Sequence, residues 1–148
     1  MIQLWDVNLL LYASISQSEH HERCRSLQQA TVDGDDYFGV SELILAAFVR
    51  IATNPRVFDP PAAPAAVFAI CTALREHPRA VAVSPGDRHW EIFQDLVLGT
   101  GIRGGDTTDA YLAALAMEHG CEFWTADKDF ARFMGLSWHN PITGARGR

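Results

Sequence analysis

Apolar residues along this chain follow two patterns: short continuous runs, and longer stretches in which they recur every three or four positions. A short run bounded by turn residues is typical of a buried strand, and the longer spacing is typical of an amphipathic helix. The two patterns alternate, which predicts an α/β fold with a parallel sheet, right-handed crossovers and helices on both faces. The strands are expected at Ile2–Asp6, Tyr37–Val40, Ala80–Val83, Cys121–Thr125 and, as a last edge strand, Leu136–Trp138.

Several of the helices expected between these strands are preceded by residues that favour a helix start. Ser41 is a predicted N-cap, because its hydroxyl can accept a hydrogen bond from a free backbone N–H of the first turn. Thr107 or Thr108 is expected to cap a later helix in the same way. The expected helices are Val7–Ala13, Glu19–Thr31, Ser41–Ala52, Ala65–Glu76, Asp87–Leu98 and Asp109–His119, with a short helical turn at Asp129–Phe133.

Length and composition fit one domain over residues 1–148, with about 141–148 as a flexible tail. An apolar content of 48% is enough for a core, and no apolar run approaches the roughly 20 residues that a membrane helix needs. The N-terminal segment lacks a basic region and Asp6 interrupts its apolar stretch, so we interpret it as core rather than as a signal peptide. The cysteines are odd in number and far apart, which argues against a zinc site or a disulfide framework and favours the cytoplasm.

Acidic residues form four islands, three after predicted strands and one at a helix start. In parallel α/β folds, strand ends and the starts of the following helices converge on one crevice. Carboxylates that converge repel one another unless a cation lies between them. The placement therefore predicts a shared metal site. The islands are Asp6, Glu42, Asp106 with Asp109, and Asp127 with Asp129.

Each acid also has an ordinary structural explanation. Asp6 is a favoured residue for a helix N-cap, and Glu42 in a first helical turn is favoured by the helix dipole. Asn8 is expected to orient Asp6, to hold a metal-bound water, or to be a turn residue. The combination of acids at several strand ends, rather than any single acid, favours the shared site.

The two later islands contain two acids each. Asp106 and Asp109 are three residues apart and can share a helix face. Asp109 is the preferred ligand, because it precedes the apolar run that packs on the sheet. Asp127 lies nearer to its strand end than Asp129, which can cap the following turn. Thr125 offers a hydroxyl to a water or a phosphate.

The ligand chemistry favours a hard cation. No histidine lies near an acidic island at metal-ligand spacing, so oxygen ligands and Mg²⁺ or Mn²⁺ are expected. The net charge of −6 equals the six island acids, because the other 12 acidic residues balance 12 Lys and Arg. One or two divalent cations would cancel much of that charge, so the acidic total does not exclude a nucleic-acid substrate.

The order of these motifs resembles the PIN-domain ribonucleases, and within them the VapC-type toxins of bacterial type II toxin–antitoxin modules. The resemblance rests on an Asp-x-Asn near the N-terminus, an SEL-type Glu, DAYLAALAMEHG, TADKDF and the closing GLSWHNP, and it covers essentially the whole chain. It implies a single PIN-like domain with a three-layer α/β/α fold and a central parallel sheet of four to five strands. The catalytic acids that it implies are Asp6, Glu42, Asp109 and Asp127.

The resemblance further implies metal-dependent endonucleolytic cleavage of RNA. Asp6, Asp109 and Asp127 would hold one or two Mg²⁺ or Mn²⁺ ions, which lower the pKa of a bound water and stabilise an in-line displacement. Glu42 would bind through water or orient the nucleophile. Because no 2′-hydroxyl attack is needed, the expected products carry a 5′-phosphate and a 3′-hydroxyl. The accessory residues are Asn8, Asp106, Thr125 and Asp129.

The partners that the resemblance implies are RNA and a VapB-type antitoxin, and a homodimer is usual in the family. The C-terminal segment of such an antitoxin lies in an apolar groove, which the expected helices Glu19–Thr31, Ser41–Ala52 and Ala65–Glu76 could supply. Basic residues near the predicted site either contact RNA phosphates or are solvated surface charges. They are Arg50, Arg56, Arg103 and Lys128.

Three alternatives fit the sequence less well. A haloacid-dehalogenase-type phosphatase needs an Asp-x-Asp after its first strand, whereas this chain has Asp6-Val7-Asn8. A receiver domain needs a phospho-acceptor Asp after its central strand, whereas that strand is followed by Ser84-Pro85. A PIN-like domain that serves only as a binding scaffold is expected to lose site acids, and none is lost here.

Overall fold

A mostly parallel sheet lies at the centre of the molecule, and the order of its strands in the sheet differs from their order in the sequence. The computed structural model describes all residues from Met1 to Arg148. The sheet has six strands in the order β3-β2-β1-β4-β5-β6. They are β1 (Gln3–Trp5), β2 (Phe38–Val40), β3 (Ala80–Ala82), β4 (Glu122–Trp124), β5 (Trp138–His139) and β6 (Arg146–Gly147).

The central strand β1 is parallel to both of its neighbours, β2 and β4. Trp5 of β1 pairs in register with Trp124 of β4, so the residues that follow the two strands emerge together at one edge of the sheet. The strand order changes direction here, because the chain adds β2 and β3 on one side of β1 and β4 and β5 on the other. Such a switch point is where α/β folds form their binding crevices.

The predicted number of four to five strands is wrong, because the sheet has a sixth strand, β6. It pairs antiparallel with β5, with Trp138 opposite Gly147. β6 lies within residues 141–148, the segment expected to be a flexible tail, and it covers the side of β5 that was predicted to be an edge. A Cβ atom at Gly147 would lie 2.5 Å from Trp138 Nε1. The close approach of β6 to the indole therefore depends on a residue without a side chain.

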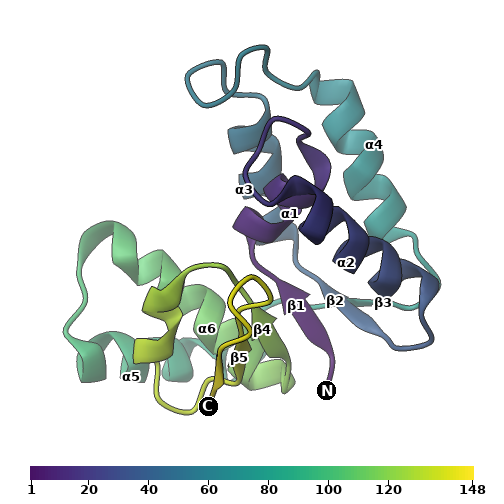
Figure 1. Cartoon of the computed structure of the whole chain (residues 1–148). Helices are drawn as coiled ribbons and strands as arrows, with labels where there is room; N and C mark the ends of the chain where they lie inside the picture. Colours follow the sequence, from purple (N-terminus) through teal and green to yellow (C-terminus); the bar gives the residue numbers. More distant parts are fainter.

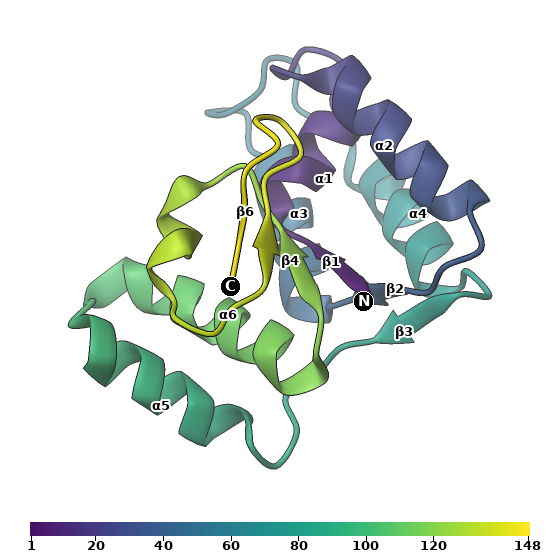
Figure 2. The same cartoon turned by 60° about the horizontal axis from the view of Figure 1, so that its bottom comes forward.

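Six helices cover the sheet, and they fall into two groups (Figure 1). α1 to α4 gather on one side of the strands, and α5 and α6 pack together on the other (Figure 2). This is the three-layer α/β/α arrangement that the alternating pattern predicts, and none of its helices is both long and apolar enough to cross a bilayer. The helices are α1 (Val7–Ser14), α2 (His21–Asp33), α3 (Glu42–Ala52), α4 (Pro64–Arg75), α5 (His89–Thr100) and α6 (Thr107–His119).

The helix starts that follow β1 and β2 are set by side-chain caps. Asp6 caps α1, and Ser41 caps α3 as predicted, with its side chain accepting a hydrogen bond from the backbone N–H of Ile44. α6 differs from the prediction, because Thr107 and Thr108 lie inside the helix rather than at its cap. A short 3₁₀ turn, η1 (Gly104–Asp106), leads into α6 instead.

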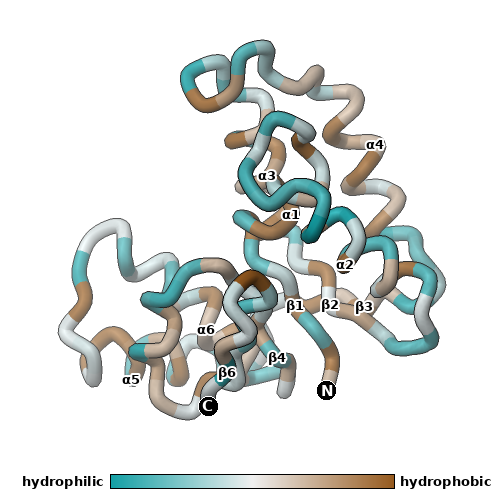
Figure 3. The backbone as a smooth tube through the Cα atoms, in the orientation of Figure 1, coloured by the Kyte–Doolittle hydropathy of each residue, from teal (hydrophilic) through white to brown (hydrophobic).

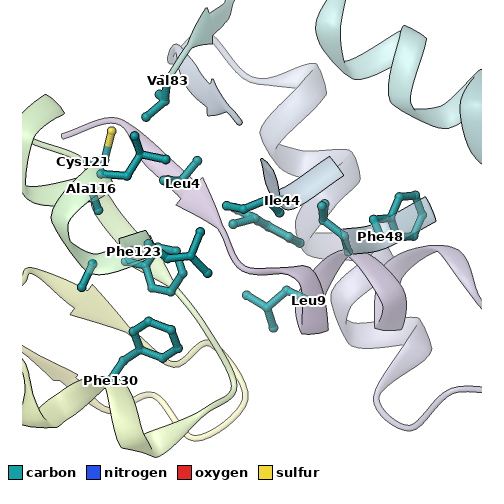
Figure 4. Packing of buried hydrophobic residues seen from close by; sticks show 14 of the residues in the cluster. Leu4, Leu9, Ile44, Phe48, Val83, Ala116, Cys121, Phe123 and Phe130 are labelled. Atoms are coloured by element: carbon teal, nitrogen blue, oxygen red, sulfur yellow. The ribbon is translucent and has the colours of Figure 1, made fainter. Parts of the chain in front are cut away.

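The core extends across both faces of the sheet (Figure 4). On the α1–α4 side, Leu9 and Phe48 are fully buried, and on the α5–α6 side Phe123 packs against Phe130 with ring centroids 4.7 Å apart. The helices contribute unequally: α6 buries most of its apolar residues, whereas α2 is largely polar in Figure 3 and buries only Cys24. A rigid sheet with a close-packed core can thus hold side chains at the ends of β1 and β4 in fixed positions.

Candidate active site

Two strands bring together segments that are more than one hundred residues apart. The backbone N–H of Asp6 donates to the carbonyl of Trp124 at 2.8 Å, which continues the β1–β4 pairing by one residue. Asp6 follows β1 and Thr125 follows β4, so their side chains meet directly beyond the ends of the two strands. The site therefore begins where the sheet topology changes direction.

The carboxylate of Asp6 is buried and almost fully hydrogen-bonded. Only 4% of the residue is exposed. Its Oδ1 accepts from the backbone N–H of Val7 at 2.7 Å, and its Oδ2 accepts from Thr125 Oγ1 at 2.7 Å and from Asn8 Nδ2 at 3.2 Å. Asp6 is thus an N-cap, as its ordinary explanation predicts, but a second set of partners also holds the carboxylate towards β4.

Burial raises the pKa of Asp6 to about 6. The hydrogen bonds from Thr125 and from the backbone of Val7 oppose this rise, because they stabilise the charged form. The negative charges of Asp109 and Asp127 add to it. The structure therefore places these three carboxylates close enough to act on one another, although they come from three separate parts of the chain.

Thr125 and Asn8 connect Asp6 to the loop that carries Asp127. Thr125 is completely buried, and its Oγ1 accepts from the backbone N–H of Asp127 at 3.0 Å while donating to Asp6. The side-chain oxygen of Asn8 accepts from the backbone N–H of Ala126 at 3.2 Å. Asn8 is therefore a link between two strand ends rather than a simple turn residue.

Asp109 lies in the first turn of α6, near enough to Asp6 for its charge to raise the pKa of Asp6. Burial and the charge of Asp127 raise its pKa, and the nearby Arg132 lowers it. Arg132 Nη2 donates to Asp109 Oδ2 at 3.0 Å. Asp106 lies further out, with 66% of its side chain exposed, and its carboxylate is 3.9 Å from Arg132 Nη1. Of this pair of acids, only Asp109 acts on Asp6.

Asp127 caps the short helix η2 (Lys128–Arg132), with its Oδ1 accepting from the backbone N–H of Asp129 at 2.8 Å. Asp127 is half-buried, whereas Asp129 is exposed. The cap is therefore Asp127, not Asp129 as the spacing suggested. The charge of Asp129 also raises the pKa of Asp109, but it is the smallest of the several contributions to that shift.

Glu42 is not brought into this group. It is the first residue of α3 and follows the strand β2, as predicted, but its carboxylate forms an ion pair with Arg75 of α4 at 2.9 Å. Its side chain is 78% exposed, and it does not contribute to the raised pKa of Asp6 or Asp109. Of the predicted catalytic acids, Asp109 and Asp127 are thus near enough to Asp6 to raise its pKa, whereas Glu42 is engaged with Arg75.

One basic residue at the site, Arg132, was not predicted from the sequence. Arg132 contacts two of the site acids, and its only sequence signal is a single Arg in the otherwise apolar segment that follows Asp129. Arg50 lies in a hollow of about 340 Å³ between α3 and α6, which also reaches Asp6. The predicted residues Arg103 and Lys128 are both exposed.

The donor set suits a hard divalent cation, because it consists of carboxylates with a hydroxyl and an amide beside them. As the side chains stand, no group of three or more acidic, His or Cys residues converges on one point. The Oδ1 atoms of Asp6 and Asp127 accept hydrogen bonds from backbone N–H groups, and Asp109 Oδ2 accepts one from the guanidinium of Arg132. Ligation by Asp109 Oδ2 would require that oxygen to exchange its present partner.

Known proteins are similar to this chain in sequence and in fold. The PIN domain family matches residues 4–136. The chain is 37% identical over 139 residues to Ribonuclease VapC43 of Mycobacterium tuberculosis, which covers 94% of this chain and 95% of that protein. It is 36% identical over 137 residues to Ribonuclease VapC33 of the same organism, with 93% and 96% covered.

Solved structures with low sequence identity share the fold. VapBC-1 from nontypeable Haemophilus influenzae matches with a TM-score of 0.67 at 16% identity, covering 96% of this chain and 99% of that chain. VapBC2 from Rickettsia felis, solved bound to a DNA fragment from their promoter, matches with a TM-score of 0.66 at 15% identity, covering 95% and 98%. The arrangement of strands and helices is therefore an established one.

Proposed function

Because the chain belongs to the PIN-domain family of VapC ribonucleases, we propose that it is an endoribonuclease and the toxin of a toxin–antitoxin module. The observation that carries the catalytic part is the buried carboxylate of Asp6 with its pKa raised by burial and by the charges of Asp109 and Asp127. Burying one carboxylate near two others does not stabilise a fold, so a structural role alone does not explain it. Such an arrangement is common at sites that bind a cation or transfer protons.

Three carboxylates would hold the cation in this proposal: Asp6, Asp109 and Asp127. One or two Mg²⁺ or Mn²⁺ ions would supply an activated water and neutralise charge on the scissile phosphate. Cleavage by water leaves a 5′-phosphate and a 3′-hydroxyl, which separates this reaction from one that uses the 2′-hydroxyl. A metal-free ribonuclease would need a His or Lys pair for acid–base work, and the acids here lie with Arg132 instead.

The chain's own residues prepare Asp6 for this role. The hydroxyl of Thr125 donates to Asp6 Oδ2 and so favours the ionised carboxylate that a cation needs. Asn8 donates to the same oxygen and also accepts from the backbone of Ala126, which keeps the two strand ends at a fixed separation. Thr125 and Asn8 therefore act as positioning residues for Asp6.

RNA would approach through the hollow between α3 and α6. Asp6 and Arg50 both line this hollow, and Arg50 carries a guanidinium. A guanidinium can bind a phosphate with two parallel hydrogen bonds. Arg103 and Lys128 are exposed and could contact phosphates further along the strand. Glu42 would take part only after leaving Arg75, by binding through water or orienting the nucleophile.

A VapB-type antitoxin is the proposed partner, since the fold relatives include VapBC assemblies. An apolar hollow of about 340 Å³ lies between α3 and α4, and Phe68 on its wall is 56% exposed. A peptide segment with apolar side chains fits such a surface. Phe68→Glu is expected to weaken antitoxin binding in a calorimetric titration, and unchanged affinity would place the antitoxin elsewhere. A homodimer is proposed from the family alone.

The experiment that tests the catalytic proposal compares purified, antitoxin-free protein with two variants on a panel of structured RNAs. Asp6→Asn removes the buried charge, and Asp95→Asn removes an exposed carboxylate of α5 as a matched control. Cleavage is expected with Mg²⁺ or Mn²⁺ in the wild type and the control, but not in EDTA or in Asp6→Asn. The products should be substrates for an exonuclease that requires a 5′-phosphate.

Several results would contradict the proposal. Cleavage that persists in EDTA would show that no metal ion is needed, and cleavage by Asp6→Asn at the wild-type rate would show that this carboxylate is not part of the active site. Products with a 2′,3′-cyclic phosphate would show that the 2′-hydroxyl is the nucleophile. If no RNA is cleaved and no metal binds, the domain is better described as a scaffold.

A further inference from the structure

Arg132, the last residue of η2, contacts two of the site acids. Its Nη2 lies 3.0 Å from Asp109 Oδ2, and its Nη1 lies 3.9 Å from Asp106 Oδ2. Its side chain is 28% exposed and that of Asp109 is 27% exposed. The pair is therefore largely shielded from water, unlike the exposed ion pair of Glu42 and Arg75.

We propose that Arg132 is a built-in counter-cation, which neutralises Asp109 in the metal-free protein and must release it when a divalent cation binds. The inference rests on the proposed metal-dependent function and adds a regulatory element to the same site. Arg132 is thus a positioning residue, since it acts on the cation through Asp109 and Asp106. The metal affinity of the site is then set by competition between one fixed charge of the protein and a divalent ion from solution.

The position of the guanidinium supports this role, because it is held from more than one direction. Its central carbon lies 5.1 Å from the centroid of the buried Phe133 ring, in a cation–π contact. Its Nε is buried and has no hydrogen-bond partner. A buried donor without a partner is destabilising, so a purely structural arginine would be expected to have a hydrogen-bond partner at this atom. The head group instead directs its charge at two acids.

The guanidinium of Arg132 and a divalent cation would compete for the same carboxylate, that of Asp109. A cation that uses Asp109 Oδ2 would share this oxygen with the guanidinium and be repelled by it. A divalent ion gains more from the three aspartates than one guanidinium does, but it has to displace the guanidinium first. The wild-type affinity should accordingly be lower than these acids alone would allow.

The test is Mn²⁺ binding to the full-length, antitoxin-free protein at pH 7.5, measured by electron paramagnetic resonance of the free ion. Arg132→Gln removes the charge and keeps much of the side-chain length. Arg25→Gln, on the exposed face of α2, makes the same change in net charge away from the site. We expect Arg132→Gln to bind Mn²⁺ about tenfold more tightly, and Arg25→Gln to stay within about twofold of the wild type.

Arg132→Lys provides a second variant in case the glutamine variant fails to fold. It keeps a charge but not the planar fork that matches a carboxylate, so its Mn²⁺ affinity should lie between those of the wild type and Arg132→Gln. An independent measurement follows the Hε–Nε signal of Arg132 by NMR during a Mg²⁺ titration. This signal should move with the same midpoint as metal binding, because the guanidinium leaves Asp109.

The outcomes separate this inference from the function on which it rests. If the wild type binds Mn²⁺ and Arg132→Gln binds it equally or more weakly, Arg132 is not a counter-cation, and the metal site remains. If Arg132→Gln binds and the wild type does not, the competition is confirmed in its strongest form. If neither binds, both the inference and the metal-dependent function are wrong.

Discussion

Replacing Asp6 by Asn should stabilise the metal-free protein at neutral pH and have much less effect in acid. The pKa of Asp6 lies at about 6 in the folded protein, above its ordinary value of 3.8. The folded state therefore binds the proton more tightly than the unfolded state does. The stability cost of the ionised carboxylate is absent below pH 3.8, grows as the pH rises, and is complete above pH 6. Asparagine has no such cost at any pH.

The magnitude follows from the two pKa values. A difference between 3.8 and about 6 corresponds to about 3 kcal/mol of unfolding free energy at pH 7.5. At pH 4.5 the folded carboxyl is still almost fully protonated, and only about 1 kcal/mol of the cost is present. The stability gain of Asp6→Asn should thus be about 2 kcal/mol larger at pH 7.5 than at pH 4.5. Its capping of α1 should survive, since Asn and Asp are equally good N-caps.

The assay is urea unfolding followed by tryptophan fluorescence, in EDTA, at both pH values and at one protein concentration. Asp95→Asn controls for the loss of a surface carboxylate, and its effect should stay within about 0.5 kcal/mol at each pH. A stability change for Asp6→Asn that is the same at both pH values would refute the reasoning. So would a variant that is less stable than the wild type at pH 7.5, because Asp6 would then be a purely stabilising residue.

Three further changes test the site and the fold. Thr125→Val removes the hydroxyl that donates to Asp6, so the pKa of Asp6 should rise above about 6 in a carboxyl ¹³C NMR titration, and an unchanged pKa would mean that this hydrogen bond is energetically unimportant. Gly39→Ala places a Cβ 2.9 Å from Val83 Cγ2 and should destabilise the protein by about 1–3 kcal/mol in urea unfolding. Wild-type stability of this variant would show that β2 and the Val83 side chain can move apart without cost. Deletion of residues 141–148 removes β6 and should lower the melting temperature in differential scanning calorimetry, because it uncovers β5; an unchanged value would restore the interpretation of a loose tail.

Much of the site was predictable because it depends on strand ends, and strand ends are visible in a sequence. An apolar run that stops at an Asp places that Asp at the edge of a parallel sheet, whatever the rest of the fold. Asp6 and Asp127 were found in this way, and Asp109 was found because it opens an apolar helix. The preference for Asp109 over Asp106 as a ligand stays a prediction; in the structure, Asp109 is the member of the pair whose charge raises the pKa of Asp6.

Long-range pairing was not predictable in the same way. The ion pair of Glu42 with Arg75 joins residues on two helices, and its geometry depends on how α3 and α4 pack. Arg132 meets Asp109 because η2 turns back towards α6, and nothing in its neighbourhood in the sequence indicates that turn. β6 pairs with β5 only because its glycine allows the chain to lie against Trp138.

The division has a physical reason. Hydrophobic periodicity and capping act over a few neighbouring residues, so the sequence alone determined the strands, the helices and the acids at their ends. Which charge lies against which other charge depends on the packing of elements that are distant in the chain. The tertiary structure therefore decided that Asp6, Asp109 and Asp127 act on one another, that Glu42 is held apart, and that Arg132 lies where a cation is expected.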